Sequence, residues 1–205
     1  MAKIKTKRER VKFASDNVTG ACPEVLDAIL KANDEDRTPY GNDELSKNLQ
    51  NKFSEIFEKE VIVFPTASGT AANALALSTM TPSFGNIYCH RLSHINVDEC
   101  GAPEFYTGGA KLVNLDGING KIIPEELDDS ISGKGIVHHT QPSSVSITQL
   151  CETGVAYQLD EIKKISEVAH KHKLNIHMDG ARSVSYTHLR AHETDSYLVC
   201  RLLLE

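Results

Sequence analysis

The chain has 205 residues, of which 40% are hydrophobic and 24% are charged, and its formal net charge is −6. This composition is typical of a globular protein that is long enough for one large domain with a buried core. The negative charge disfavours nucleic acid as a partner, and no run approaches the ~20 apolar residues of a membrane span.

The five cysteines are scattered and include no CxxC pair. They indicate neither a disulfide framework nor a metal site. The first ten residues are basic, but no apolar stretch follows them, so they do not form the pattern of a secretory signal. We therefore expect a reduced, cytoplasmic protein.

Hydrophobic periodicity predicts two helices and then a strand in the first third of the chain. Pro23 opens a helix whose apolar residues share one face. Residues 45–57 carry a second apolar stripe at helical spacing. The short β-branched run at 61–64 predicts a buried strand, and residues 70–80 have high helix propensity.

Further along, strands and helices alternate. Short strands are expected near 86–89, 111–115 and 143–147, and another over 174–178. Pro124 opens a predicted helix, and Asp160 is the expected N-cap of a helix over 161–173. This alternation predicts an α/β fold with a mostly parallel sheet and helices on both faces.

The stretch PTASGTAAN, residues 65–73, joins a predicted strand to a predicted helix through small residues. Free N–H groups and the helix dipole at such a turn favour an anion such as phosphate. Ser68 and Thr70 add hydroxyl donors beside Gly69. A plain serine or threonine N-cap on a core helix is the competing interpretation.

The stretch HMDGAR, residues 177–182, places Asp179 at the end of a predicted strand. In parallel sheets, ligands bind at the carboxyl ends of the strands. A carboxylate there can pair with a protonated ring nitrogen of a cofactor, and Arg182 can bind a carboxylate with two parallel hydrogen bonds. Alternatively, Asp179 and Arg182 pair with each other across a turn.

His94 follows a predicted strand, with Asp98 and Glu99 shortly after it. Its imidazole can stack on an aromatic cofactor ring or transfer protons. For a single histidine, a structural role is the simpler interpretation. His94 and Asp98 could also be two metal ligands, but no third ligand has suitable spacing, so no metal site is predicted.

Several of these motifs together resemble the threonine aldolases, a group of β-eliminating lyases of the pyridoxal phosphate (PLP) fold type I. The matching stretches are FASDN, YGND, ASGTAAN, SHINVDE with GAPE, TQLCETG and HMDGAR. The resemblance implies an aspartate-aminotransferase-like large domain, here incomplete, that binds PLP. It also implies aldol cleavage of a β-hydroxy-α-amino acid, as in threonine to glycine and acetaldehyde, by a homodimer or homotetramer.

The resemblance also implies roles for particular residues. Ser68, Gly69 and Thr70 would bind the phosphate. His94 would stack on the pyridine ring and act as a base, and Asp179 would bind the pyridine nitrogen. Arg182 and Ser15 would bind the substrate carboxylate, and three further residues would lie near the site: Tyr40, Asp43 and Glu99.

The sequence departs from this family after residue 182. The family's Schiff-base lysine follows the Asp-Gly-Ala-Arg stretch, whereas the last lysine here is Lys173. Residues 183–205 resemble a translated adapter or vector rather than the family, so we expect residues 1–182 to be an N-terminal segment with part of the PLP-binding domain. The chain is then expected to be an inactive fragment.

Two other functions remain open at this point. Another PLP-dependent β-eliminating lyase would need the same electron sink, although GAPE and SDN favour the aldolase. A non-catalytic module that keeps the fold would account for the missing lysine, but it would leave HMDGAR without a purpose.

Overall fold

The computed structural model describes residues 18, 20–34 and 36–182. The chain divides between Asn48 and Leu49 into two compact units. The first contains α1 (Pro23–Asn33) and the beginning of α2 (Glu44–Ile56), which confirms both N-terminal helices. No helix among the described residues has both the length and the apolar character needed to cross a membrane.

The second unit is built on a four-stranded sheet with the order β2-β1-β3-β4. Its strands are β1 (Gly85–His90), β2 (Lys111–Leu115), β3 (Gln141–Thr148) and β4 (Asn175–Asp179). Every pairing is parallel, as expected. All four strands therefore end at the same edge of the sheet, where Thr148 of β3 lies opposite Asp179 of β4.

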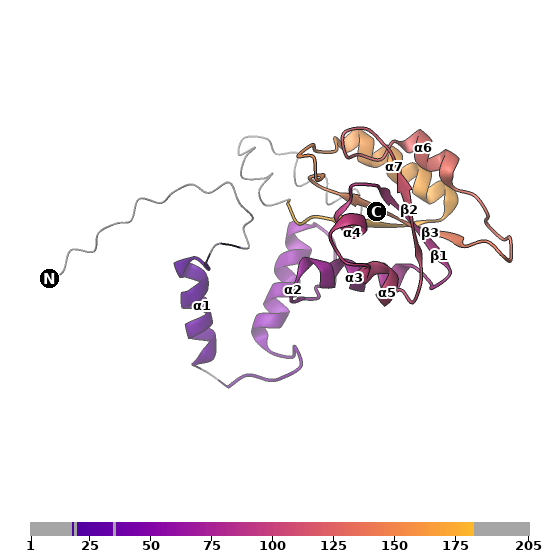
Figure 1. The fold of residues 1–205 in the computed structure, drawn as a ribbon. Helices are drawn as coiled ribbons and strands as arrows, with labels where there is room; N and C mark the ends of the chain where they lie inside the picture. Colours follow the sequence, from indigo (N-terminus) through magenta and orange to yellow (C-terminus); the bar gives the residue numbers. More distant parts are fainter. Residues whose placement is uncertain (1–17, 19, 35, 183–205) are drawn as a thin grey trace. The chain divides into compact units, whose positions relative to one another are not determined.

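Helices cover both faces of this sheet (Figure 1), which confirms the predicted fold class. On one face lie α6 (Pro124–Ser130) and α7 (Leu159–His172), and on the other lie α3 (Gly69–Met80) and α5 (Ala102–Tyr106). The short α4 (His94–Val97) follows β1. The sequence pattern did not predict α4 or α5.

The two faces of the sheet differ in chemistry because neighbouring strand residues point to opposite sides. Val145 and Ile147 of β3 belong to the larger apolar core, which also includes Leu127 of α6 and Ile162 of α7. The alternate serines of β3 point the other way. One of them, Ser144, is hydrogen-bonded to the hydroxyl of Thr81 at the end of α3.

The predicted strand at 61–64 is wrong. Ile62 and Phe64 are 76% and 70% exposed, and the segment has no strand partner among the described residues. The backbone N–H groups of Val61 and Val63 instead donate to side chains of α2, at 3.2 and 2.9 Å. A β-branched run favours extended backbone, but a strand also needs a neighbour for its hydrogen bonds.

The predicted N-cap of α7 is also wrong. The cap is Gln158 rather than Asp160. A reciprocal capping box forms, in which the Glu161 carboxylate accepts from the Gln158 backbone N–H at 2.6 Å. Glutamate at the third helical position thus fixes where the helix begins.

We predict that Ile162→Ala lowers the free energy of unfolding by about 2–5 kcal/mol, because it opens a cavity in the apolar core. Ile162 is fully buried, whereas Ile118 is 60% exposed. Ile118→Ala is therefore the matched control and should change the same quantity by less than about 0.5 kcal/mol. Urea unfolding measures both, and equal losses would contradict this packing.

Candidate active site

Asp179 is the last residue of β4, so the expected strand-end carboxylate is in place. Its side chain is buried, and residue exposure is 8%. One carboxylate oxygen accepts from the backbone N–H of Ala181 at 2.9 Å, and the other accepts from the Asn73 amide at 3.0 Å. Among the described residues, Asp179 forms no ion pair, although a buried carboxylate is costly without one.

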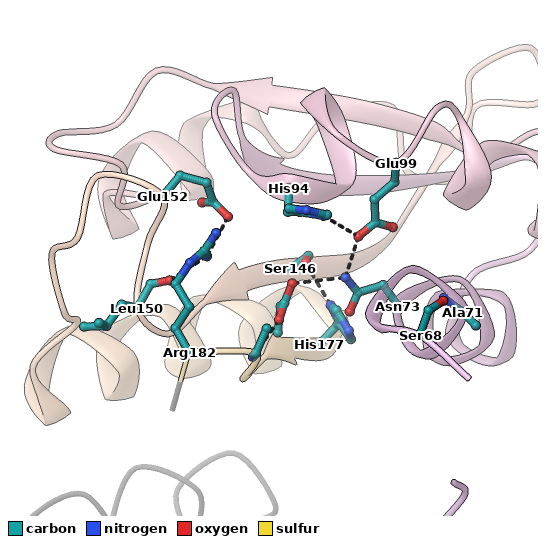
Figure 2. A network of polar contacts seen from close by, with 12 residues as sticks. Ser68, Ala71, Asn73, His94, Glu99, Ser146, Leu150, Glu152, His177 and Arg182 are labelled. Carbon is teal, nitrogen blue, oxygen red and sulfur yellow. Dashed lines mark hydrogen bonds and ion pairs between the residues drawn. The ribbon is translucent and has the colours of Figure 1, made fainter. Parts of the chain in front are cut away.

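A chain of hydrogen bonds connects Asp179 to His94 through Asn73 and Glu99. Figure 2 shows its part from Asn73 to His94. The Asn73 amide nitrogen, which binds Asp179, also donates to Glu99 Oε1 at 2.7 Å. The same Glu99 oxygen lies 2.8 Å from His94 Nδ1. Because a carboxylate accepts, Nδ1 must carry the proton, which leaves the lone pair of a neutral imidazole on Nε2. The second Glu99 oxygen is buried and has no hydrogen-bond partner among the described residues.

Asn73 is the last residue of the motif at 65–73, but the sequence predicted no role for it. A signal was available, because Asn73 is the one polar residue among the buried positions of α3, beside Ala74 and Leu77. A buried amide in an alanine- and leucine-rich helix needs hydrogen-bond partners. Those partners could not be named, since they come from distant parts of the chain.

Ser68 is the N-cap of α3, and its hydroxyl oxygen accepts from the Ala71 N–H at 3.2 Å. The simple capping interpretation is therefore realised. The cap still leaves the N–H groups of Gly69 and Thr70 without partners inside the helix. A Cβ added at Gly69 would meet nothing within 4 Å, so space is open beside this helix end. Both interpretations of the stretch are compatible.

Arg182 does not pair with Asp179. One guanidinium nitrogen donates to the Glu152 carboxylate at 3.0 Å and to the Leu150 carbonyl at 3.2 Å (Figure 2). The side chain remains 38% exposed. A guanidinium has five N–H donors, and the contacts with described residues use only one of its nitrogens.

His177 lies on β4 two residues before Asp179 and therefore faces the same side of the sheet. Its Nδ1 is 2.9 Å from the hydroxyl of Ser146 on the neighbouring strand. Burial lowers the pKa of His177 from 6.5 to about 4, although the nearby Asp179 charge opposes this. The imidazole next to the site is therefore neutral at physiological pH.

The structure does not test the predicted roles of Ser15, Tyr40 and Asp43. Ser15 lies outside the described residues. Tyr40 and Asp43 belong to the first compact unit, so their predicted roles stay untested. Within that unit, hydrogen bonds from the side chain and backbone of Ser46 hold the pKa of Asp43 below its ordinary value. Asp98, which the sequence analysis considered together with His94 as a metal ligand, is exposed.

Solved structures with a similar fold include a threonine aldolase and an enzyme that contains PLP. The threonine aldolase of Leishmania major matches with a TM-score of 0.77 and 26% identity, over 83% of this chain and 49% of that one. Cystalysin of Treponema denticola, whose structure contains PLP, matches with a TM-score of 0.54 and 15% identity, over 78% of this chain and 40% of that one. The second likeness supports the fold alone.

The chain belongs to the beta-eliminating lyase family, whose model matches residues 12–193. It is 41% identical over 170 residues to a low specificity L-threonine aldolase of Pseudomonas sp. strain NCIMB 10558. It is 31% identical over 172 residues to a probable low-specificity L-threonine aldolase of Schizosaccharomyces pombe. Each match covers 83% of this chain and 49% or 45% of the relative, so the chain spans about half their length. The domain boundary at residue 182 stays a prediction.

We predict that His177 makes stability fall in mild acid. Its pKa is depressed in the folded state, so the unfolded state binds this proton first, and stability is lost as pH falls from 6.5 towards about 4. The slope from this one proton is about 1.4 kcal/mol per pH unit. Urea unfolding across this range should show a smaller slope for His177→Asn.

His170 is the control for this experiment, because it is a histidine on the exposed side of α7. The variant His170→Asn should keep the wild-type slope. If His177→Asn kept that slope as well, the buried neutral imidazole would be ruled out as its source.

Proposed function

We propose that a protein of this sequence, at the full length of its relatives, is a PLP-dependent lyase. It would cleave the Cα–Cβ bond of a β-hydroxy-α-amino acid, as in threonine to glycine and acetaldehyde. The observation that carries this proposal is Asp179, a buried carboxylate at a strand end with two neutral donors and no ion pair among the described residues.

The residues present fit PLP. A protonated pyridine nitrogen would supply the positive charge that the buried carboxylates of Asp179 and Glu99 lack. The second oxygen of Glu99, which has no hydrogen-bond partner among the described residues, could accept a further donor. The first turn of α3, at Ser68, Gly69 and Thr70, would hold the phosphate.

When bound, PLP supplies a positively charged ring that accepts electron density from the carbon–carbon bond being broken. Asp179 would keep the ring nitrogen protonated. His94 would lie on the ring face and accept the proton of the substrate hydroxyl at Nε2, because its Nδ1 proton is held by Glu99. The free donors of Arg182 would bind the substrate carboxylate, with Ser15 and Tyr40 as further contacts.

The 205-residue chain itself would hold PLP without a covalent bond, since no lysine follows Lys173. We therefore propose that it does not cleave threonine. Trapping bound PLP with borohydride on a lysine of this chain would contradict that statement. A cytoplasmic location and a homodimer or homotetramer belong to the same proposal.

A second candidate is another β-eliminating lyase, which would use the same charged ring to release a different β-substituent. A version extended to the length of the relatives distinguishes the two in assays with threonine, phenylserine and a β-substituted amino acid. Aldehyde release from the first two substrates supports the aldolase. Turnover of the third alone overturns it.

We predict that Asp179→Ala weakens PLP binding to the chain at least tenfold, which corresponds to about 1.4 kcal/mol. The physical reason is the loss of the negative charge that pairs with the ring nitrogen. Asp98→Ala is the control, because it removes an exposed carboxylate close in sequence to His94. Fluorescence titration with PLP measures both variants, and equal affinities for the two would refute the proposed role of Asp179.

A further inference from the structure

Asn73 lies between the two buried carboxylates of the site. Its amide nitrogen is 2.7 Å from Glu99 Oε1 and 3.0 Å from Asp179 Oδ2. Carboxylate oxygens accept hydrogen bonds, so the nitrogen end of the amide must face them and must use both of its N–H groups. The three residues are 6%, 3% and 8% exposed, so water contributes little to these contacts.

This arrangement brings two like charges close together in a buried environment, which is unfavourable unless donors lie between them. The Asn73 amide is a donor that both carboxylates share. Without it, Asp179 would retain the Ala181 N–H and Glu99 would retain His94. No other hydrogen bond among the described residues would then hold the two acids at their present separation, and repulsion would drive Glu99 away from Asp179.

Asn73 also sits on α3, a little more than one helical turn after Ser68. The first turn of α3 is suited to bind an anion, and Asn73 of the same helix contacts the carboxylate of Asp179, which is suited to bind a cation. A single rigid element connects the two ends of the site.

We propose that Asn73 is a positioning residue, which fixes Asp179 and Glu99 with one amide group and thereby links the tautomer of His94 to the charge at position 179. The purpose of this link in catalysis rests on the function proposed above. The link itself is a property of the protein alone. Hydrogen bonds through Asn73 and Glu99 connect Asp179 to His94.

The test is nitrogen NMR of the full chain with 15N-labelled histidine, at a mildly alkaline pH and without cofactor. The wild-type His94 should carry its proton on Nδ1. Asn73→Leu, which removes both donors at similar size, should lower the population of this tautomer about twofold or more. Asn73→Ala serves the same purpose if the leucine variant does not fold.

Thr81→Val is the matched control, because it removes another buried side-chain hydrogen bond on the same side of the sheet. Thr81 contacts Ser144 at 2.7 Å and neither carboxylate. This variant should leave the His94 tautomer unchanged. A shift of equal size in Thr81→Val would overturn the proposal, since general loosening of the fold would then explain the result.

A double-variant cycle tests the link to position 179. In an Asp179→Asn background the repulsion is absent, so Asn73→Leu should shift the His94 tautomer less than it does in the wild type. An equal shift in both backgrounds, or no shift in either, overturns the proposal. If this cycle overturns the role of Asn73 while Asp179→Ala still weakens PLP binding as predicted, the proposed function stands. The PLP titration does not depend on Asn73.

Discussion

The site depends on a negative charge held at the buried end of a strand. Removing a carboxylate from water costs roughly several kcal/mol in a real protein interior, and neutral donors recover part of that cost. Asp179 receives one such donor from Ala181, within its own turn, and one from Asn73, on a helix far away in sequence. The arrangement makes the surroundings favourable for a cation, and this preference connects the fold to the chemistry.

One face of the sheet packs against the apolar core, and the other face carries the polar residues of the candidate site. The face towards α6 and α7 is apolar, and its core includes Val145, Ile147 and Ile162. The face towards α3 carries alternate polar residues of the same strands, including Ser146, His177 and Asp179. Because strand residues alternate, one short segment such as β4 can serve both faces. The apolar face can therefore stabilise the sheet while the polar face presents the side chains of the candidate site.

Much of the fold could be predicted from local patterns, and most of the site's connections could not. Periodicity, helix propensity and the positions of proline located α1, α2, α3, α6 and α7 and all four strands, and the run before Asp179 placed that residue at a strand end. The segment at 61–64 failed because local preference does not reveal whether a partner strand is present. Asn73 was missed because the contact with Asp179 spans 106 residues of sequence. The pairing of Arg182 with Glu152 likewise depends on how distant loops meet.

The central claim is that Asp179 holds a positive ring at the strand end. It is tested most directly by nitrogen NMR of PLP labelled with 15N at the pyridine nitrogen and bound to the chain. The account predicts a protonated ring nitrogen that remains protonated well above the pH at which free PLP loses that proton. A bound cofactor whose ring nitrogen is unprotonated at neutral pH would contradict it.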